Sequence, residues 1–424
     1  MNTLIKNVEL YENEQYVNRH ITISDNIITA ITPNLPPELD FDVVIDGSNK
    51  FATPGLVNTH THAAMTLFRS YADDMFLMDW LENKIWPAEA NLTAEDVYWG
   101  TLLSIGEMLK SGTTCFADMY FFMDEVAKAV ETSGIRACLS RGLAGVAPNS
   151  DKSLLEAKEF CLKWNGAANG RITTMLGPHA PYTCPPDYLK QVIEVAKEIK
   201  AEIHIHLSET KFEVDTCIEK FGKTPIAHMD SLGLLDLGVL AAHCVHVTPE
   251  DIQLMKAKNV RVAHNPQSNL KLASGIAPVQ QMLEAGLIVG LGTDGASSNN
   301  NLDLLEEVRL AALLHKVRED NPKVIPAQTA LEMGTSCGAQ ALGLDKVGKL
   351  AVGYKADIVL YDMNKLTWAP KHDRNSLLVY SANSSDVHTV LVDGQVLVAD
   401  GKLTTIDEAQ VIAEVSKRGL DLVK

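Results

Sequence analysis

The sequence predicts an α/β fold: a TIM-type (β/α)₈ barrel with a small β-sandwich domain built from both termini. From residue 53 to about residue 352, short apolar runs alternate with longer amphipathic stretches, a pattern typical of βα units around a parallel sheet. Eight such runs can be counted. Eight strand and helix units over about 300 residues favour a closed barrel, because an open doubly wound sheet usually needs fewer strands.

Helical stretches separate the eight predicted strands. AEDVYWGTLLSIGEMLKSG repeats apolar residues at intervals of three and four and ends on Gly112, a typical helix C-cap. PPDYLKQVIEVAKEIK follows the same pattern. We therefore predict that residues 55–353 form the barrel. Its strands are GLVNTH (55–60), TTCFAD (113–118), RACLSR (136–141), ITTMLGPH (172–179), EIHIHLSE (202–209), VLAAHC (239–244), RVAHNP (261–266) and IVGLGTD (288–294).

The two ends of the chain have a different pattern from the barrel. Residues 1–54 and 354–424 contain short alternating segments interrupted by Asp-Asn and Asp-Gly pairs, which favour β-hairpins. Neither end offers enough strands for a stable sheet of its own, so we predict that they pair into one β domain. The last segment, IDEAQVIAEVSKRGLDLVK, is predicted to be a terminal helix.

The composition favours a compact enzyme of the cytoplasm that acts on a small molecule. Apolar residues make up 46% of the 424 residues, too many for a disordered chain. The net charge of −17 and the absence of a Lys/Arg-rich block argue against nucleic acid or an anionic membrane as partner. No signal peptide or spanning segment is apparent. Seven scattered cysteines without a C-x-x-C pair fit a reducing compartment. A homo-oligomer is compatible with these features.

Three histidines and one aspartate fall at the carboxyl ends of predicted strands. His60 and His62 end the first strand, His206 ends the fifth and Asp294 ends the eighth. In a barrel these ends converge on the face where active sites are built. Three neutral imidazoles and one carboxylate suit a single divalent ion, most often zinc, with iron and manganese as alternatives. The pattern therefore predicts a metal-dependent hydrolase.

Further polar residues surround this predicted metal site. Glu209 follows His206 by three residues, close enough to act as a proton shuttle for a water on the metal without being a ligand. The glycines on either side of Asp294 are expected to let the backbone turn sharply at the barrel mouth. His204 lies one layer deeper than His206 and is expected to fill the barrel interior.

Six motifs together resemble the amidohydrolase superfamily, and most closely its 5-methylthioadenosine/S-adenosylhomocysteine deaminases. They are PGLVNTHTH, HIHLSE, AAHCVH, HNPQSN, GLGTDGASSNN and GYKADIVLYD, in that order along essentially the whole chain. Binuclear members of the superfamily commonly carry a carboxylated lysine at the end of the fourth strand. Here that strand ends in LGPHA, with His179 and no lysine, which points to one metal ion.

The resemblance implies a reaction and a role for each site residue. The reaction is hydrolytic deamination of adenine nucleosides by a hydroxide generated on the metal, with ammonia released. The implied metal ligands are His60, His62, His206 and Asp294; the implied catalytic residues are Glu209, His243 and Asp294; and the implied substrate contacts are Trp80, Glu89, Arg141, His179, Glu209 and Asp294.

Several alternatives stay open at this point. Glu89 could cap or precede a helix that begins near Thr93, and Trp80 could be an ordinary core residue. The same metal site could serve a guanine, cytosine or triazine aminohydrolase, but Glu89 and Arg141 favour a substrate with ribose and a polar tail. A catalytically silent binding protein is disfavoured, because no ligand or proton-shuttle position is missing.

Overall fold

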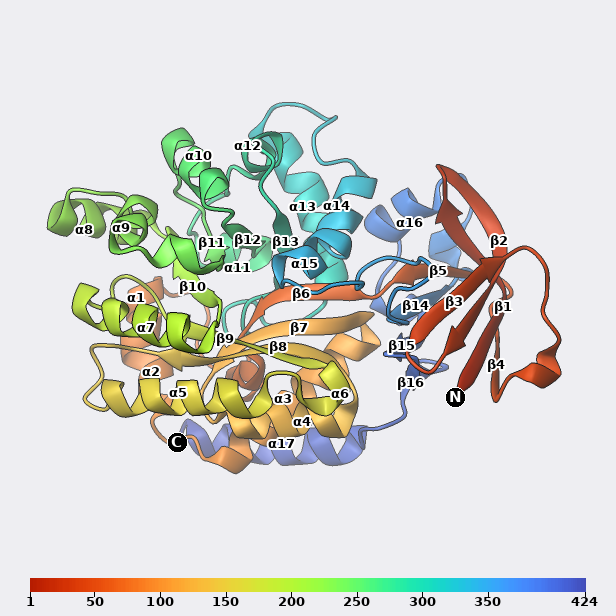
Figure 1. Cartoon of the computed structure of the whole chain (residues 1–424), viewed down its shortest axis with the longest axis horizontal. Coiled ribbons are helices and arrows are strands. Elements are labelled where there is room, and N and C mark those ends of the chain that lie inside the picture. Colours follow the sequence, from red (N-terminus) through yellow and green to blue (C-terminus); the bar gives the residue numbers. More distant parts are fainter.

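The computed structural model describes residues 1–424 and consists of a barrel with a β-sheet beside it (Figure 1). The barrel closes through eight strands in the order β10-β11-β12-β13-β6-β7-β8-β9, and all neighbouring pairs are parallel. Every one of the eight predicted runs overlaps one of these strands, so the predicted barrel is confirmed. The strands are β6 (Leu56–Thr61), β7 (Thr113–Tyr120), β8 (Arg136–Leu143), β9 (Ile172–Pro178), β10 (Ile203–Leu207), β11 (Val239–His243), β12 (Arg261–His264) and β13 (Val289–Leu291).

Helices surround the barrel and follow its strands along the chain (Figure 1). A capping box between Thr93 and Asp96 starts α3, and Gly112, just beyond its end, has a φ of +91°. None of the helices combines the length and apolar character needed to cross a membrane. The barrel helices are α3 (Ala94–Lys110), α4 (Met123–Ser133), α5 (Ser150–Trp164), α6 (Ala167–Gly170), α7 (Pro186–Ile199), α8 (Lys211–Phe221), α9 (Pro225–Leu232), α10 (Pro249–Ala257), α11 (Pro266–Lys271), α12 (Val279–Glu284), α13 (Leu304–Arg318), α14 (Ala327–Met333) and α15 (Ser336–Ala341).

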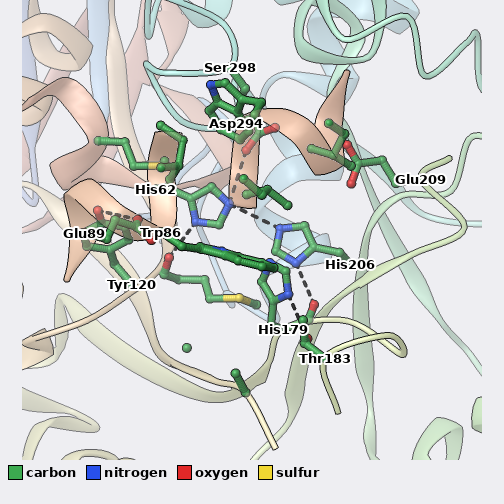
Figure 2. Close-up of a pocket in the computed structure, with 18 of the residues that line it drawn as sticks. His62, Trp86, Glu89, Tyr120, His179, Thr183, His206, Glu209, Asp294 and Ser298 are labelled. Atoms are coloured by element: carbon green, nitrogen blue, oxygen red, sulfur yellow. Dashed lines mark hydrogen bonds and ion pairs between the residues drawn. The ribbon is translucent and has the colours of Figure 1, made fainter. Parts of the chain in front are cut away.

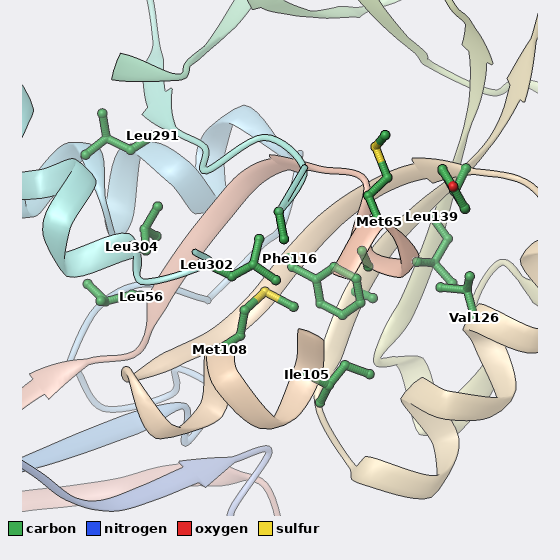
Figure 3. Close-up of a cluster of buried hydrophobic side chains, with 14 of the residues drawn as sticks. Leu56, Met65, Ile105, Met108, Phe116, Val126, Leu139, Leu291, Leu302 and Leu304 are labelled. Atoms are coloured by element: carbon green, nitrogen blue, oxygen red, sulfur yellow. The ribbon is translucent and has the colours of Figure 1, made fainter. Parts of the chain in front are cut away.

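A large apolar core lies between the barrel strands and these helices (Figure 3). Ile105 and Met108 of α3 are fully buried and belong to the same core cluster as Phe116 of β7. Leu302, which precedes α13, joins this cluster from the far end of the sequence. Burying such side chains is the main favourable contribution to folding, at about 1.5–3 kcal/mol each. The strand ends that carry the site are therefore held on a rigid base.

The two ends of the chain pair into one nine-stranded sheet, as the hairpin signals predicted. The path runs β17-β16-β15-β14-β5-β1-β2-β3, with β4 beside β1, and the antiparallel pair of β14 with β5 joins the two ends. The Asp393-Gly394 pair between β15 and β16 has positive φ at both residues, as a two-residue hairpin turn requires. The strands are β1 (Asn2–Glu12), β2 (Gln15–Ser24), β3 (Ile27–Thr32), β4 (Val43–Asp46), β5 (Lys50–Pro54), β14 (Ile358–Asp362), β15 (Val387–Val392), β16 (Gln395–Ala399) and β17 (Lys402–Leu403).

Two polar contacts fasten this terminal region to the barrel. Arg136, at the start of β8, donates to both carboxylate oxygens of Asp357 at 2.9 and 3.1 Å and to Asp393 at 3.0 Å, and all three residues are buried or nearly so. The terminal helix α17 (Glu408–Leu422) lies against α3 (Figure 1), and its Arg418 pairs with Asp96 at 2.9 Å. The predicted terminal helix is therefore present, packed on the barrel.

Candidate active site

The carboxyl ends of the barrel strands bring distant histidines together (Figure 2). The ring centroids of His60 and His62, both from β6, lie 4.9 Å apart, and that of His206 from β10 lies 4.7 Å from His60. The ring of His243, at the end of β11, lies 5.4 Å from that of His206. Asp294 follows β13 and directs one carboxylate oxygen at His60 and His62. Five residues spread over more than half of the chain thus form one cluster.

The backbone around Asp294 is shaped differently from the sequence expectation. Asp294 itself has the left-handed conformation, with a φ of +61°, whereas neither flanking glycine does. The glycines instead allow close approach: a Cβ on Gly292 would lie 2.4 Å from the Asn265 Oδ1 atom and 2.9 Å from the His60 Cβ. A Cβ on Gly295 would lie 3.1 Å from the Cβ of His62. Because Gly292 and Gly295 have no side chain, the loop around Asp294 (residues 292–295, the Asp294 loop) can lie directly against His60 and His62.

Backbone carbonyls fix the orientation of two of the imidazoles. The Nδ1 atom of His62 lies 2.7 Å from the Met119 carbonyl oxygen, and that of His206 lies 2.7 Å from the His179 carbonyl oxygen. A carbonyl can only accept, so each Nδ1 carries the hydrogen and each Nε2 has a free lone pair. The two Nε2 atoms face each other at 3.3 Å, an arrangement without a shared hydrogen that a cation between them would stabilise.

The spacing of neighbouring donor atoms suits a small cation: those of His60, His62 and His206 lie within 4.8 Å of one another, as do those of His60, His243 and Asp294. The Asp294 Oδ1 atom lies 3.4 Å from His60 Nε2 and 3.3 Å from His62 Nε2. For ligands about 2.0–2.1 Å from zinc, tetrahedral geometry places neighbouring donors about 3.3–3.4 Å apart. His60 Nε2 is also buried without any hydrogen-bond partner. These donors therefore fit a divalent ion.

The charges of these groups are set by burial and by one another. Burial lowers the pKa of His60 to about 4 and that of His206 well below its ordinary value, which keeps both rings neutral. Burial alone would raise the pKa of Asp294, but its interactions with the surrounding His60, His62 and His243 outweigh burial and hold that pKa well below its usual range. Ser268 donates to Asp294 Oδ2 at 2.7 Å and thereby orients the carboxylate. The set thus offers neutral nitrogens and one anionic oxygen.

Glu209 lies beside this cluster on the loop after β10. Its Oε2 atom is 3.9 Å from His243 Nε2. Both carboxylate oxygens of Glu213 accept backbone N–H groups, those of Ser208 and Glu209 at 2.8 and 2.9 Å, and so hold the loop in place. Burial raises the pKa of Glu209 above its ordinary value. Burial lowers the pKa of His243, but the charges of Glu209 and Asp294 more than compensate and raise it.

A second carboxyl group, that of Glu89, lines the same cavity as Glu209. It ends α2 (Trp86–Glu89), which continues from α1 (Leu77–Trp80) through the π-helical segment η3 (Leu81–Ile85). The hydroxyl of Tyr120 donates to Glu89 at 2.7 Å (Figure 2). Burial raises the pKa of Glu89 to about 7 against this hydrogen bond. Thr93 and Asp96 cap α3, so Glu89 is not the cap of that helix.

One cavity of about 350 Å³ is lined by most of these groups, namely His62, Glu89, His206, Glu209, His243 and Asp294. Trp80 is buried in its wall, and His179 borders it with a pKa that burial lowers to about 3. Arg141 does not line the cavity: its guanidinium donates to the Gly142 carbonyl, to Ser153 and to Glu156. The remaining lining is largely apolar, with Leu77, Leu81, Met119, Phe121, Leu143, Ala144, Val146 and Ala147 among its members.

Several residues that shape the site were not predicted from the sequence. Tyr120 ends β7 and Glu213 lies in the first turn of α8, and neither carries a motif of its own. Asp118 ends the predicted strand TTCFAD, a position that could have drawn attention: it accepts from the backbone N–H of Ala63 at 2.7 Å, just beyond His62. His204, expected as barrel filling, is buried but lies 2.8 Å from His60 Nδ1.

A closed barrel of eight parallel strands with histidines and an aspartate gathered at their carboxyl ends is the architecture of a metal-dependent hydrolase. The chain belongs to the amidohydrolase family, whose model matches residues 51–397. It is 54% identical over 424 residues to the 5-methylthioadenosine/S-adenosylhomocysteine deaminase of Carboxydothermus hydrogenoformans, covering 99% of this chain and 98% of that one. The enzyme of the same name from Dictyoglomus turgidum is also 54% identical, over the full length of both chains.

Solved structures agree with this assignment. An adenosine deaminase from Xanthomonas campestris with bound zinc superposes with a TM-score of 0.93 at 34% identity and covers 99% of this chain and 98% of that one. A guanine deaminase from C. acetobutylicum reaches a TM-score of 0.84 at 24% identity over 93% of this chain and 100% of that chain, a likeness of fold alone.

Proposed function

We propose that this protein deaminates adenine nucleosides hydrolytically, converting 5′-methylthioadenosine to 5′-methylthioinosine and S-adenosylhomocysteine to S-inosylhomocysteine with release of ammonia. The family membership and the names of the relatives support the reaction class. The observation that carries the proposal is that His62, His206, Asp294, Glu209 and Glu89 line a single cavity, with His60 buried beside the metal-suited donor atoms of this set. In this proposal residues 55–353 are the catalytic barrel, and residues 1–54 and 354–424 form the supporting β domain.

The proposed metal ligands are His60, His62, His206 and Asp294, and the proposed ion is zinc. The donor set of three imidazoles and one carboxylate is the chemistry that zinc prefers in hydrolases. When bound, the ion would make a water molecule acidic enough to provide a hydroxide nucleophile near neutral pH. The solved relative with bound zinc supports this choice of metal.

Glu209 is the proposed proton shuttle to the adenine ring. Because burial raises its pKa, it can hold a proton at the start of the reaction and give it to N1 of the purine. A proton on N1 draws electrons from C6, which then accepts the attacking oxygen. As the C6 carbonyl forms, the hydroxyl proton of the tetrahedral intermediate returns to Glu209, which restores its starting state.

Asp294 and His243 are the proposed acceptors of the proton that leaves the attacking water. The Asp294 carboxylate is anionic, and the His243 ring lies in the same cluster, so both can hold this proton for one step. They then deliver it to the amino group on C6, which departs as ammonia. One water is consumed and one ammonia is formed, and every side chain ends as it began.

The other proposed contacts place the nucleoside in the cavity. The Glu89 carboxyl group, fixed by Tyr120, is suited to the ribose hydroxyls, while Trp80 and His179 border the space for the base. Arg141 remains a proposed contact, but its guanidinium is engaged here by Glu156, Ser153 and Gly142, so it would meet the substrate after leaving Glu156.

A substrate panel tests the proposal. Purified protein with measured metal content is assayed for ammonia release from adenosine, methylthioadenosine, S-adenosylhomocysteine, guanine and cytosine. We expect turnover of the thioether nucleosides, with a Glu89→Gln variant impaired on nucleosides chiefly through KM. Activity confined to a free base would contradict the roles of Glu89 and the nucleoside assignment.

A further inference from the structure

A chain of hydrogen bonds runs beneath the proposed metal ligands from the barrel backbone to His60. The Ser140 Oγ atom lies 2.7 Å from the Asp118 carbonyl oxygen and 3.1 Å from His204 Nδ1. The His204 Nε2 atom lies 2.8 Å from His60 Nδ1. The four residues come from β7, β8, β10 and β6, and each is 1% exposed or less. These four residues are therefore shielded from bulk solvent.

The direction of the chain follows from its first member. The Asp118 carbonyl can only accept, so the short contact with Ser140 is a hydrogen bond only if the serine hydroxyl donates to it. The hydroxyl has one hydrogen, so its oxygen must accept from His204 Nδ1. The opposite arrangement would leave two oxygens 2.7 Å apart with no hydrogen between them.

The same logic carries through both imidazoles. A neutral imidazole has one N–H, so a hydrogen on His204 Nδ1 leaves its Nε2 as an acceptor. His60 must then donate from Nδ1, which leaves His60 Nε2 as a bare lone pair. That atom is the buried nitrogen without a partner that faces Asp294 at 3.4 Å.

His60 differs in this respect from the other two histidines of the set. Backbone carbonyls, which cannot reverse, hold His62 and His206 in the Nδ1–H form. The partner of His60 is a side chain that can accept or donate. Only Ser140 and the Asp118 carbonyl remove this ambiguity.

We propose that His204 is a positioning residue that fixes the tautomer of His60 and so keeps its Nε2 available to the metal. The proposal rests on the ligand set given under Proposed function. Groups behind metal ligands commonly change metal affinity about 10- to 100-fold when they are removed. His204 therefore acts on metal binding through His60, without touching the substrate.

Two substitutions of His204 separate this role from simple packing. In His204→Gln the amide oxygen occupies the place of Nε2 and can accept from His60, whereas His204→Leu removes the acceptor. We expect zinc affinity, measured by competition with a chelator on metal-stripped protein, to fall about 10- to 100-fold in His204→Leu. We expect His204→Gln to stay within about threefold of the wild type, as rescue by an acceptor requires. Equal affinity in all three proteins, or equal loss in both variants, would overturn the proposal.

A measurement on the wild-type protein does not depend on the variants folding. In protein labelled with ¹⁵N at histidine, imidazole nitrogen shifts distinguish Nδ1–H from Nε2–H rings. We expect His204 to be an Nδ1–H tautomer in both the metal-free and the zinc-loaded protein. An Nε2–H ring at His204 would overturn the proposed direction of the hydrogen bonds. Zinc stoichiometry of the wild type distinguishes failure of this proposal from failure of the proposed function. If the wild type does not bind one zinc ion, the proposed ligand set is wrong. If it binds one zinc ion but substitutions of His204 leave the affinity unchanged, only the positioning role of His204 is wrong.

Discussion

Arg141 forms an ion pair with Glu156, with 3.1 Å between its Nη2 atom and Oε2 of the glutamate. The cavity is lined by 25 residues, and none of them is a lysine or arginine. A homocysteine tail would bring its carboxylate into this cavity without meeting a cation, at a cost in desolvation. We therefore expect kcat/KM for methylthioadenosine to exceed that for S-adenosylhomocysteine about tenfold, a difference of about 1.4 kcal/mol. Steady-state kinetics with both substrates measure this ratio, and a value of one or below contradicts the expectation.

Releasing Arg141 should shift this preference. Glu156→Ala removes the carboxylate partner, so the guanidinium becomes free to reach an anionic tail at the cavity rim. We expect the ratio of the two kcat/KM values to narrow in this variant. Glu159→Ala, an exposed position on the same helix α5, is the control and should leave the ratio unchanged. If both variants behave alike, the ion pair has no part in substrate preference.

Glu209→Gln should keep the metal and lose turnover. The substitution preserves the shape of the side chain but removes the proton that N1 of the purine needs. We expect kcat to fall about 10²- to 10⁴-fold, the range for loss of a general acid or base, while zinc content stays at the wild-type level. Near-normal kcat in zinc-replete Glu209→Gln would remove this residue from the mechanism.

Gly292→Ala should weaken metal binding without a direct change to any ligand. The new methyl group would lie 2.9 Å from the His60 Cβ and 2.4 Å from Asn265, so β6 and the Asp294 loop must separate. We expect a lower zinc content after purification and a proportional loss of activity. Gly106→Ala on α3 serves as the control, because its new Cβ meets only the end of Leu403, at 3.2 Å. Unchanged zinc content in Gly292→Ala would show that the close approach is not required.

The Glu213 carboxyl group should make stability depend on pH. Burial raises its pKa to about 7 from the ordinary 4.5. As the pH rises, Glu213 therefore loses its proton in the unfolded chain before it does so in the folded protein. The stability that the protonated Glu213 carboxyl group contributes is complete below about pH 4.5 and is lost by about pH 7. The free energy of unfolding falls over this range by no more than about 1.4 kcal/mol per pH unit. Glu213→Gln lacks this titration. The wild type should thus lose unfolding free energy relative to the variant between these pH values, measured by urea denaturation of metal-free protein. Parallel curves would contradict the raised pKa.

The barrel and its cluster of donors could be predicted because both depend on short-range patterns. The alternation of strand and helix patterns in the sequence places His60, His206 and Asp294 at strand ends. Closure of the barrel then brings those ends together. The roles of Tyr120 and His204 could not be predicted in this way. Each depends on a partner from another strand or loop, and the side-chain direction that makes the contact has no signature in the sequence. Arg141 illustrates the same limit. The sequence motifs singled out this residue, but nothing in the sequence predicted that its side chain would pair with Glu156.

The most direct test of the central claim is a zinc titration of metal-stripped protein with methylthioadenosine as substrate. Conversion of the adenine ring to the hypoxanthine ring is followed by absorbance, and ammonia is measured in parallel. The proposed single site predicts no activity without metal, a linear rise with added zinc and a break at one zinc per chain, with one ammonia for each nucleoside converted. Full activity without metal, or a break at two zinc ions per chain, would contradict a mononuclear deaminase built on His60, His62, His206 and Asp294.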